Sequence, residues 1–551
     1  MRHLRLTAFV VGVLATVALV AAPPAFSLTA YEQSLANLTW QNSGPSYQRS
    51  KDSCGSSRDL CTEVARPEQY WGNHYVGHDE PSILFYSKQP GSGNNMTYQL
   101  TLPREPAGGY SKAKSYDFEL TPAFWVGMAL CDNFSYPQTV PTCTPDSDSN
   151  AVNVATSTHH PGAAYMELQF YPPGWIPQWA NTSCDPRAWC AALTIDSLSV
   201  NPVAGTMLNT TCQNEISGGL EYVNFAYLTH NGEPQGPPNP VEFDPLVSGV
   251  PGPHVLYMNP GDKLTVSLHD SLDGLVTRVV DNTSHQSGFM TASAGNGFGH
   301  IVPAPHGTGC HLKYYNFHPM YSTSQPNTTV PWAAATYNVA IDTEVGHFDF
   351  CTHIDANSPV GGCNGLEGGA GNREVADGDD AFCFPAAESL RYPVTGCVDS
   401  NDPGFDGPSY VRDWPNGKPT HPTPMLFSSP LIGGKTRYSQ AAFNTDLPAI
   451  ETPDIGGKCD VVTGRRCTDP PPTDDGAPAF YPYYSTVSSS GGCRWAIGNL
   501  AGVPGTTNSF GATARSEYGP LQRQRGYVFN GGGATQVVYL DFQRTLPNNP
   551  C

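Results

Sequence analysis

Short runs in which apolar and polar residues alternate recur along most of the chain, and this is the pattern of half-buried β-strands. The segment 263–269 shows the pattern clearly, and 274–280 repeats it after a turn at 271–274, which predicts a hairpin. The segments 82–87 and 96–102 flank a turn rich in glycine and asparagine, so we expect a second hairpin there.

The segment 163–171 predicts a strand with a carboxylate at its centre. Successive side chains of a strand point to opposite sides, so the apolar residues Met166, Leu168 and Phe170 should face the core. The opposite, outward face then carries polar groups, with an indole just beyond the strand: Tyr165, Glu167, Gln169 and Trp175. A phenol, a carboxylate and an amide in one row suit the binding of a sugar or another polar polymer.

The predicted strands recur at intervals of about 8–20 residues without a long amphipathic helix, which favours a mostly β fold, a β-sandwich or jelly roll. After residue 355 the chain becomes rich in glycine, aspartate, asparagine and proline. We therefore expect a β-sandwich core over 28–354, and a loop-rich region over 355–551 that returns to strands near its C-terminal end.

The chain begins with basic residues and an apolar run over 6–20, followed by small residues and prolines over 21–30. This is the pattern of a secretory signal peptide, which we place at 1–27. A membrane anchor is the alternative, but the apolar run of about 15 residues is shorter than the roughly 20 that span a bilayer. We therefore expect a secreted, extracellular protein that is free of the membrane after cleavage.

The net charge of −20 argues against nucleic acid and anionic membrane surfaces as partners, because both attract basic proteins. It also disfavours strongly anionic polysaccharides, unless a local basic patch or calcium intervenes. Only 14% of the residues are charged, while 56 glycines and 52 prolines indicate many turns and loops. We expect a monomer whose partner is an extracellular polysaccharide or glycan.

All 16 cysteines follow the predicted signal peptide, and an even number in an exported chain indicates disulfide bonds. Spacing does not determine connectivity, but several neighbours are close enough for local loops: Cys54 with Cys61, Cys131 with Cys143, Cys184 with Cys190, Cys351 with Cys363, Cys383 with Cys397, and Cys459 with Cys467. Four cysteines would then remain for longer links, namely Cys212, Cys310, Cys493 and Cys551.

Two neighbouring segments carry a resemblance to a known family. The segment 259–268 has Gly261-Asp262 before its strand, and the turn at 281–288 ends in Gln286-Ser287 and a glycine. Together they resemble a strand and hairpin of secreted glutamic peptidases, which implies a concanavalin-like jelly-roll sandwich. Those peptidases use a glutamine and a glutamate, which the resemblance does not place on this chain. The whole chain also resembles large secreted microbial proteins without an assigned activity, which implies no chemistry.

Paired carboxylates are the leading candidate for catalysis. Glu167 and Glu221 both lie at strand positions among apolar and aromatic neighbours, and Asp196 lies on the strand predicted at 193–198. Glycoside hydrolysis needs two carboxyl groups about 5–10 Å apart, and partial burial raises the pKa of a carboxyl group, which suits a general acid. The alternative is that these carboxylates lie on solvated strand faces or pair with basic or phenolic side chains.

Two further clusters suggest metal ions. Closely spaced aspartates in a glycine-containing loop suit calcium, and the candidates are Asp377, Asp379 and Asp380. A row of His347, Asp349 and His353 could contribute to another metal site with His311 or His318. A solvated turn is the alternative for the first cluster, and a disulfide at Cys351 competes with the second.

The sequence leaves three functions open. The leading hypothesis is a polysaccharide hydrolase or lyase with Glu167, Glu221 and Asp196 as its catalytic residues. The second is an acid-acting peptidase of the glutamic type. The third is a glycan-binding or surface protein without catalysis. A carboxylate pair would favour the hydrolase, a glutamine–glutamate pair the peptidase, and a flat aromatic strip the binding protein.

Overall fold

The computed structural model describes the β-strand framework of the chain and its nearest connections. Apart from a few single positions, the described residues are 82–104, 124–132, 163–171, 185–201, 206–216, 221–302, 307–319, 332–336, 349–350, 394–395, 425–447, 484–489, 492–497, 521–530, 533–546 and 548–551. Antiparallel strands make up nearly all regular structure in these ranges, as the alternating pattern predicted. No helix in this part of the chain is long and apolar enough to cross a membrane.

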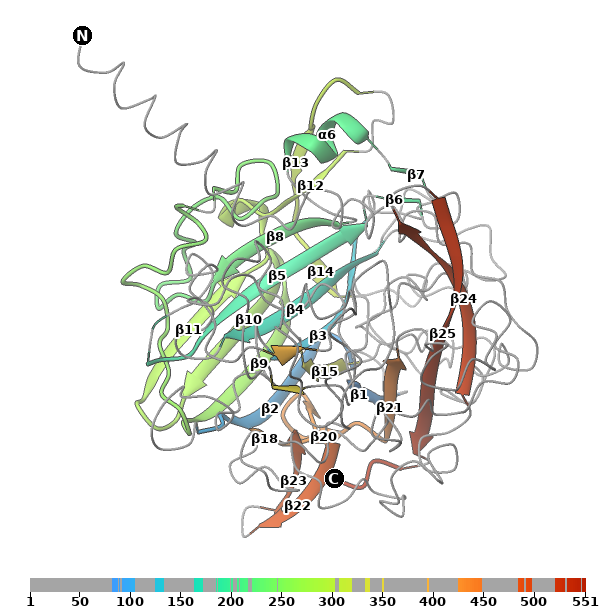
Figure 1. Cartoon of the computed structure of the whole chain (residues 1–551). Coiled ribbons are helices and arrows are strands. Elements are labelled where there is room, and N and C mark those ends of the chain that lie inside the picture. Colours follow the sequence, from blue (N-terminus) through green and yellow to red (C-terminus); the bar gives the residue numbers. More distant parts are fainter. Residues whose placement is uncertain are drawn as a thin grey trace.

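The larger sheet has ten described strands (Figure 1). Its order is β24 (Leu521–Asn530), β25 (Gly533–Leu546), β21 (Gln440–Leu447), β1 (Ser82–Tyr86), β15 (Trp332–Thr336), β3 (Phe124–Cys131), β4 (Ala163–Tyr171), β5 (Cys190–Leu198) and β8 (Glu221–Tyr227), with β14 (His318–Pro319) beside β3. Strands from both ends of the sequence therefore meet in this one sheet.

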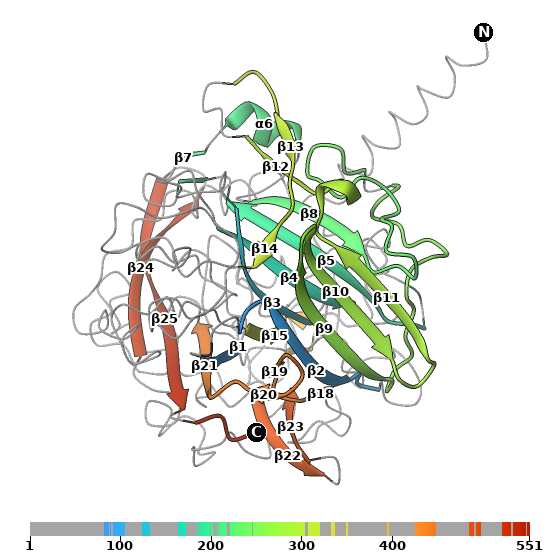
Figure 2. The ribbon, with the colours of Figure 1, turned by 180° about the vertical axis from the view of Figure 1, so that it is seen from behind.

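The second large sheet has nine described strands, and Figure 2 shows several of them in front of the larger sheet. Its order is β11 (Gln286–Thr291), β10 (Gly274–Asp281), β9 (Lys263–Ser271), β2 (Asn95–Thr101), β18 (Met425–Phe427), β23 (Gly492–Ile497) and β22 (Tyr484–Ser489). The short strand β19 (Leu431–Ile432) pairs with β2, and β20 (Thr436–Arg437) pairs with β19.

Smaller elements surround the two sheets in the described ranges. Three two-stranded ribbons are β12 (Gly299–Ile301) with β13 (Leu312–Tyr314), β16 (Asp349–Phe350) with β17 (Val394–Thr395), and β6 (Val200–Asn201) with β7 (Thr206–Met207). The helical elements are the single-turn 3₁₀-helix η4 (Ala294–Asn296) and the short α-helix α6 (Thr210–Glu215).

Large aromatic side chains join the two sheets. Trp332 of the larger sheet is fully buried, and its ring lies 4.8 Å from that of Tyr98 and 6.3 Å from that of Phe427, both in the second sheet. The Tyr484 hydroxyl also crosses between the sheets and donates a 2.6 Å hydrogen bond to the Ala334 carbonyl. Since such rings bury large apolar areas, these contacts form the centre of the core.

The two predicted hairpins have different outcomes. The pairing of β9 with β10 runs from Ser271 opposite Gly274 to Leu264 opposite Asp281, which confirms the first. The second prediction is wrong, because β1 pairs with β15 and β21 of the larger sheet, whereas β2 pairs with β9, β18 and β19 of the second. A turn between two strands allows them to pair, but burial of apolar faces on both sheets places them in different layers.

Disulfide bonds connect distant segments, as the leftover cysteines suggested. Cys212 bonds to Cys310, 98 residues away, and Cys493 bonds to Cys551, 58 residues away. Cys131 and Cys190 are also disulfide-bonded. The first link fastens α6 to the loop before β13, where the Asn209 side chain also donates a 3.0 Å hydrogen bond to the Gly309 carbonyl.

Removing the Cys212–Cys310 bond should destabilise the protein measurably. We expect the double variant Cys212→Ala with Cys310→Ala to lose about 2–5 kcal/mol of unfolding free energy, because the long loop that the bond closes becomes free in the unfolded chain. Urea unfolding of the oxidised proteins checks this. An unchanged midpoint and slope would show that the bond adds no stability.

Two buried carboxyl groups meet where β9 begins and β10 ends. Asp262 is 4% exposed and Asp281 is fully buried. Burial and the neighbouring Asp281 raise the pKa of Asp262, against the effect of the hydrogen bonds from Asn259. Burial also acts to raise the pKa of Asp281, but hydrogen bonds from Ser284, Thr283 and Asp262 outweigh it and lower that pKa. The pair therefore favours a state with one proton, held by Asp262.

This pair should make stability depend on pH. The raised pKa of Asp262 gives stability that is fully present below its unfolded value and is lost as pH rises through the folded value. The lowered pKa of Asp281 gives stability that is present above its unfolded value and is lost as pH falls through the folded value. The pair therefore stabilises the protein most when the pH lies between the two folded pKa values.

The variant Asp262→Asn tests this dependence, because its amide can donate to Asp281 at every pH. As pH rises from about 4, the ordinary pKa of an aspartate, we expect the wild type to lose unfolding free energy relative to the variant. Urea unfolding at several pH values measures the difference. Parallel pH profiles would contradict a proton shared between these two groups.

Candidate functional site

Three neighbouring strands bring the predicted carboxylates to one face of the larger sheet. In β4 and β5, Tyr165 lies opposite Asp196 and Glu167 lies opposite Thr194. In β5 and β8, Leu198 lies opposite Glu221. Directly opposite residues share a face, and so do alternate residues of one strand. Glu167, Asp196 and Glu221 therefore occupy the same side of the sheet.

The register separates these three carboxylates unequally. Glu167 and Asp196 are diagonal neighbours on adjacent strands, and such positions are roughly 7–8 Å apart. Glu221 lies two strands from Glu167 and four positions further along β8, which corresponds to roughly 16 Å between the two backbones. Asp196 is therefore better placed than Glu221 to act together with Glu167.

A chain of hydrogen bonds along β4 fixes the surroundings of Glu167. The Gln169 Nε2 group donates to Glu167 Oε2 at 2.7 Å, and the Tyr171 hydroxyl donates to Gln169 Oε1. Burial, followed by the nearby Tyr227, Glu167 and Asp196, raises the pKa of Tyr171 well above its ordinary value. The phenol therefore stays protonated and holds the Gln169 amide with its nitrogen toward Glu167.

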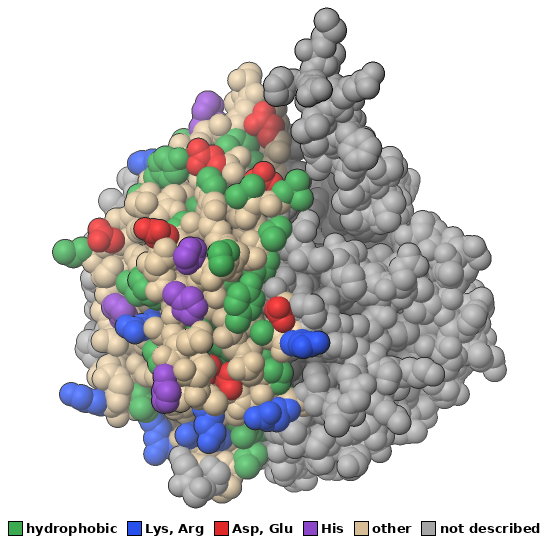
Figure 3. Space-filling view, turned by 90° about the vertical axis from the view of Figure 1, so that its left-hand side faces the viewer, with side chains coloured by type: hydrophobic (Ala, Val, Ile, Leu, Met, Phe, Trp, Pro, Cys, Tyr) green, Lys and Arg blue, Asp and Glu red, His purple; other side chains and the backbone are tan. Residues whose placement is uncertain are grey.

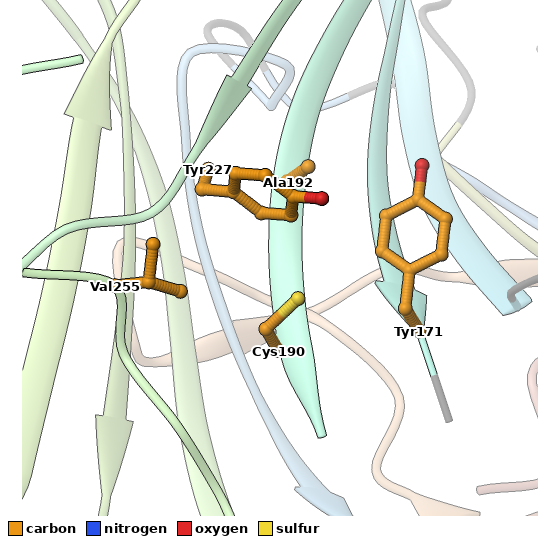
Figure 4. Close-up of a cluster of buried hydrophobic side chains, with 5 residues drawn as sticks. All are labelled: Tyr171, Cys190, Ala192, Tyr227 and Val255. Atoms are coloured by element: carbon orange, nitrogen blue, oxygen red, sulfur yellow. The ribbon is translucent and has the colours of Figure 1, made fainter. Parts of the chain in front are cut away.

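An aromatic and aliphatic cluster encloses one end of this face. Figure 4 shows that its members come from β4, β5, β8 and the proline-rich loop after β8: Tyr171, Cys190, Ala192, Tyr227 and Val255. The Tyr227 hydroxyl donates a 3.1 Å hydrogen bond to the Gly249 carbonyl and so ties the loop to the sheet. Burial raises the pKa of Tyr227 far above its ordinary value, so this phenol is also a permanent donor.

The carboxylate face is more enclosed than the sequence suggested. Met166, Leu168 and Phe170 are fully buried, which confirms the predicted core face. Glu167, however, was expected to point outward and is only 5% exposed, while Gln169 and Asp196 are partly buried. The strand alternation gave the side of the sheet, but it does not report what covers that side.

Gly127 of β3 lies directly opposite Glu167 and allows the strands to approach closely. A Cβ atom at this position would come within 2.1 Å of the Met166 carbonyl oxygen. A side chain here would therefore push β3 away from β4 beside Glu167.

We expect Gly127→Ala to destabilise the protein by about 1–3 kcal/mol, because the new methyl group meets backbone atoms that cannot move aside. Gly295→Ala is the matched control, since a Cβ there would meet its nearest atom only at 3.7 Å. Thermal unfolding compares the two variants. Equal midpoints for both would show that β3 can move without cost.

A second polar network was missed by the sequence interpretation. The Asp132 carboxylate accepts a 2.7 Å hydrogen bond from the Ser197 hydroxyl and lies 2.8 Å from His300 Nδ1. These three residues are at most 2% exposed. Because the serine bonds to the aspartate and not to the histidine, this is not the order of a serine-hydrolase triad. Asp132 and His300 are 168 residues apart, so spacing gave no signal.

The predicted metal sites gain no support from the described part of the chain. His318 Nδ1 lies 2.8 Å from Asp270 Oδ1, a pairing that the sequence did not suggest. Among the described residues, no group of three or more histidines, cysteines or acidic residues is arranged to hold a metal ion. Several predicted residues lie outside the described ranges, namely Trp175, Asp377, Asp379, Asp380, His347, Cys351 and His353, and the Tyr165 and Glu221 side chains are likewise not described.

No protein-family model and no curated protein matches the chain. Two carboxyl groups share one face, and one of them is nearly removed from solvent and bonded to an amide. Such an arrangement can transfer protons to and from a bound substrate.

Proposed function

We propose that this protein is a secreted, glycan-active hydrolase that uses Glu167 and Asp196 as its pair of carboxyl groups. The observation that carries the proposal is their position as diagonal neighbours on β4 and β5. Their backbone positions are roughly 7–8 Å apart, so the two side chains can bring their carboxyl groups within the roughly 5–10 Å that glycoside hydrolysis requires. Glu221 occupies the same side of the sheet, but its distance from Glu167 leaves it outside this pair.

The environments of the two carboxyl groups suggest different roles. Glu167 is 5% exposed, so water has little access to its carboxyl group. We assign it the role of the acid that protonates the leaving oxygen. Asp196 is partly exposed and serves as the base or nucleophile. The pairing of a protonated and an ionised carboxyl group is the requirement of this reaction class.

The expected fold and location agree with a glycan substrate. We propose that the two large sheets form a concanavalin-like jelly-roll sandwich, and that Tyr165 and Trp175 contact sugar rings. Disulfide bonds, as found at Cys212 and Cys493, are typical of exported proteins, which supports an extracellular location.

A glutamic-type acid peptidase is the second candidate, and one observation favours it. Gln169 Nε2 donates to Glu167 Oε2 at 2.7 Å, so a glutamine and a glutamate lie side by side on one strand. In a peptidase, Glu167 would activate water and the Gln169 amide would stabilise the oxyanion. Asp196 would then have no essential role, which separates the two candidates.

Activity of the purified protein on a panel of neutral polysaccharides and one unfolded protein, at about pH 4 and about pH 7, tests both. For the hydrolase, Glu167→Gln and Asp196→Asn should each reduce sugar release by about 10²–10⁴-fold, since each removes a proton-transfer group. Glu233→Gln is the matched control, because this carboxylate is exposed and lies in the loop after β8.

The outcomes separate the alternatives. Protein cleavage that requires Glu167 and Gln169 but persists in Asp196→Asn would replace the hydrolase with the peptidase. Retention on a glycan without product would leave a binding protein. Full activity in a folded Glu167→Gln variant, with folding checked by thermal unfolding, would remove this site from either reaction.

A further inference from the structure

The outer face of the second sheet is separate from the carboxylate site and has a different chemistry. Side chains of β2, β9 and β10 alternate between the core and this surface. Figure 2 shows the three strands on the side of the molecule away from β4 and β5. We define the outer face by the polar residues at its centre, which are Thr97, Gln99, Lys263, Thr265, Ser267 and Arg278.

The strand register arranges this face in rows. Arg278 lies opposite Ser267, Ser267 opposite Thr97, and Thr97 opposite Leu431. Leu431 in turn lies opposite Arg437, so one row crosses five strands and has an arginine at each end. Neighbouring strands are about 4.8 Å apart, which places the two arginines roughly 19 Å from each other. Lys263, four positions from Ser267 on β9, adds a cation roughly 14 Å from Arg278.

Hydrogen bonds hold the polar side chains between these cations in place. Gln99 Nε2 donates to Thr265 Oγ1 at 3.0 Å, and Asn282 Nδ2 donates to the same oxygen at 2.9 Å. Side chains that are already ordered lose less entropy when a ligand binds. The face is therefore a prepared surface of hydroxyl and amide groups on a paired sheet.

The charge of this face is opposite to that of the whole chain. The net charge is −20, yet the outward positions of β2, β9 and β10 carry Lys263 and Arg278 and no carboxylate. Figure 3 shows most Asp and Glu side chains in the upper half of the described surface and most Lys and Arg in the lower half. Arg437 is exposed and also donates a 2.5 Å hydrogen bond to the main-chain oxygen of Cys551, which anchors its side chain.

We propose that the outer face binds a carboxylate-bearing polysaccharide, a polymer of uronic acid residues. The cations are too far apart to hold one small anion together, but an extended polymer can reach all of them. Arginine forms paired hydrogen bonds with carboxylates, and the hydroxyl and amide rows between the cations match the hydroxyl groups of a sugar. This binding does not depend on the proposed catalytic pair.

The acidic remainder of the chain favours a uronate polymer over nucleic acid. Charges on the protein act over about 8–10 Å at moderate ionic strength, so the local cations dominate contacts at this face. A densely charged polyphosphate also extends over the acidic surroundings and is repelled by them. A uronate polymer has a lower charge density and gains more from neutral hydrogen bonds.

Biolayer interferometry of the full mature chain on immobilised polygalacturonate, at about 20 and about 200 mM salt, tests the proposal. We expect binding at low salt that weakens as salt rises. The double variant Lys263→Gln with Arg278→Gln should bind roughly tenfold more weakly, since exposed ion pairs each contribute up to about a factor of five. Lys313→Gln is the control, because this exposed lysine lies on β13, outside the face.

Each outcome decides the proposal. Retained binding in Glu167→Gln, together with the loss in the double variant, supports a site separate from the carboxylate pair. A loss in Lys313→Gln comparable to that in the double variant would indicate diffuse attraction and overturn the proposal. Tighter binding to heparin or duplex DNA than to polygalacturonate would overturn the choice of ligand, and no binding at low salt would remove the site.

Discussion

Packing of two apolar sheet faces around Trp332 is the constraint on which the rest of the structure depends. Its ring contacts Tyr98 and Phe427 across the interface, and Phe85 beside it contacts Trp495. These residues come from positions 85 to 495, so the core forms only when distant parts of the chain meet. Once both inner faces are committed to the core, every alternate side chain must point to one of the two outer surfaces.

This constraint places the carboxylates of the larger sheet on the outer surface of that sheet. Burying Glu167 to 5% exposure would be costly without hydrogen-bond partners, because an unpaired polar group loses its water. The Tyr171, Gln169 and Glu167 chain supplies partners along one strand. At another buried position, the Asp132 carboxylate has Ser197 and His300 as its hydrogen-bond partners. Glu167 differs from Asp132 in that another acidic residue, Asp196, is its diagonal neighbour.

The two outer surfaces then differ in charge and in enclosure. The carboxylate face is partly covered by the loop after β8, which contributes Val255 and accepts the Tyr227 hydrogen bond. The outer face of the second sheet is more open and carries Lys263 and Arg278 among hydroxyl groups. The catalysis proposed for the first surface and the polymer binding proposed for the second are compatible, because the paired sheets separate the two surfaces.

Much of the local structure could be predicted from sequence. The alternating pattern gave the strand at 163–171 with its buried Met166, Leu168 and Phe170, and the β9–β10 hairpin, where a four-residue turn brings two strands together. The leftover cysteines were correctly expected to form longer links, although spacing could not choose their partners. The same pattern predicted that Glu167 faces away from the core, but it could not predict that Asp196 lies beside Glu167.

The sequence by itself determined several strands, such as 163–171 and the β9–β10 pair, and which of their side chains share a face, because a period of two is local to each strand. Only the tertiary structure decided that β1 and β2 belong to different sheets, and that β21 pairs with β1 from over 350 residues away. It also decided the enclosure of Glu167 and the row from Arg278 to Arg437. Strand partners are chosen by burial of whole sheet faces, and that free energy belongs to no single segment.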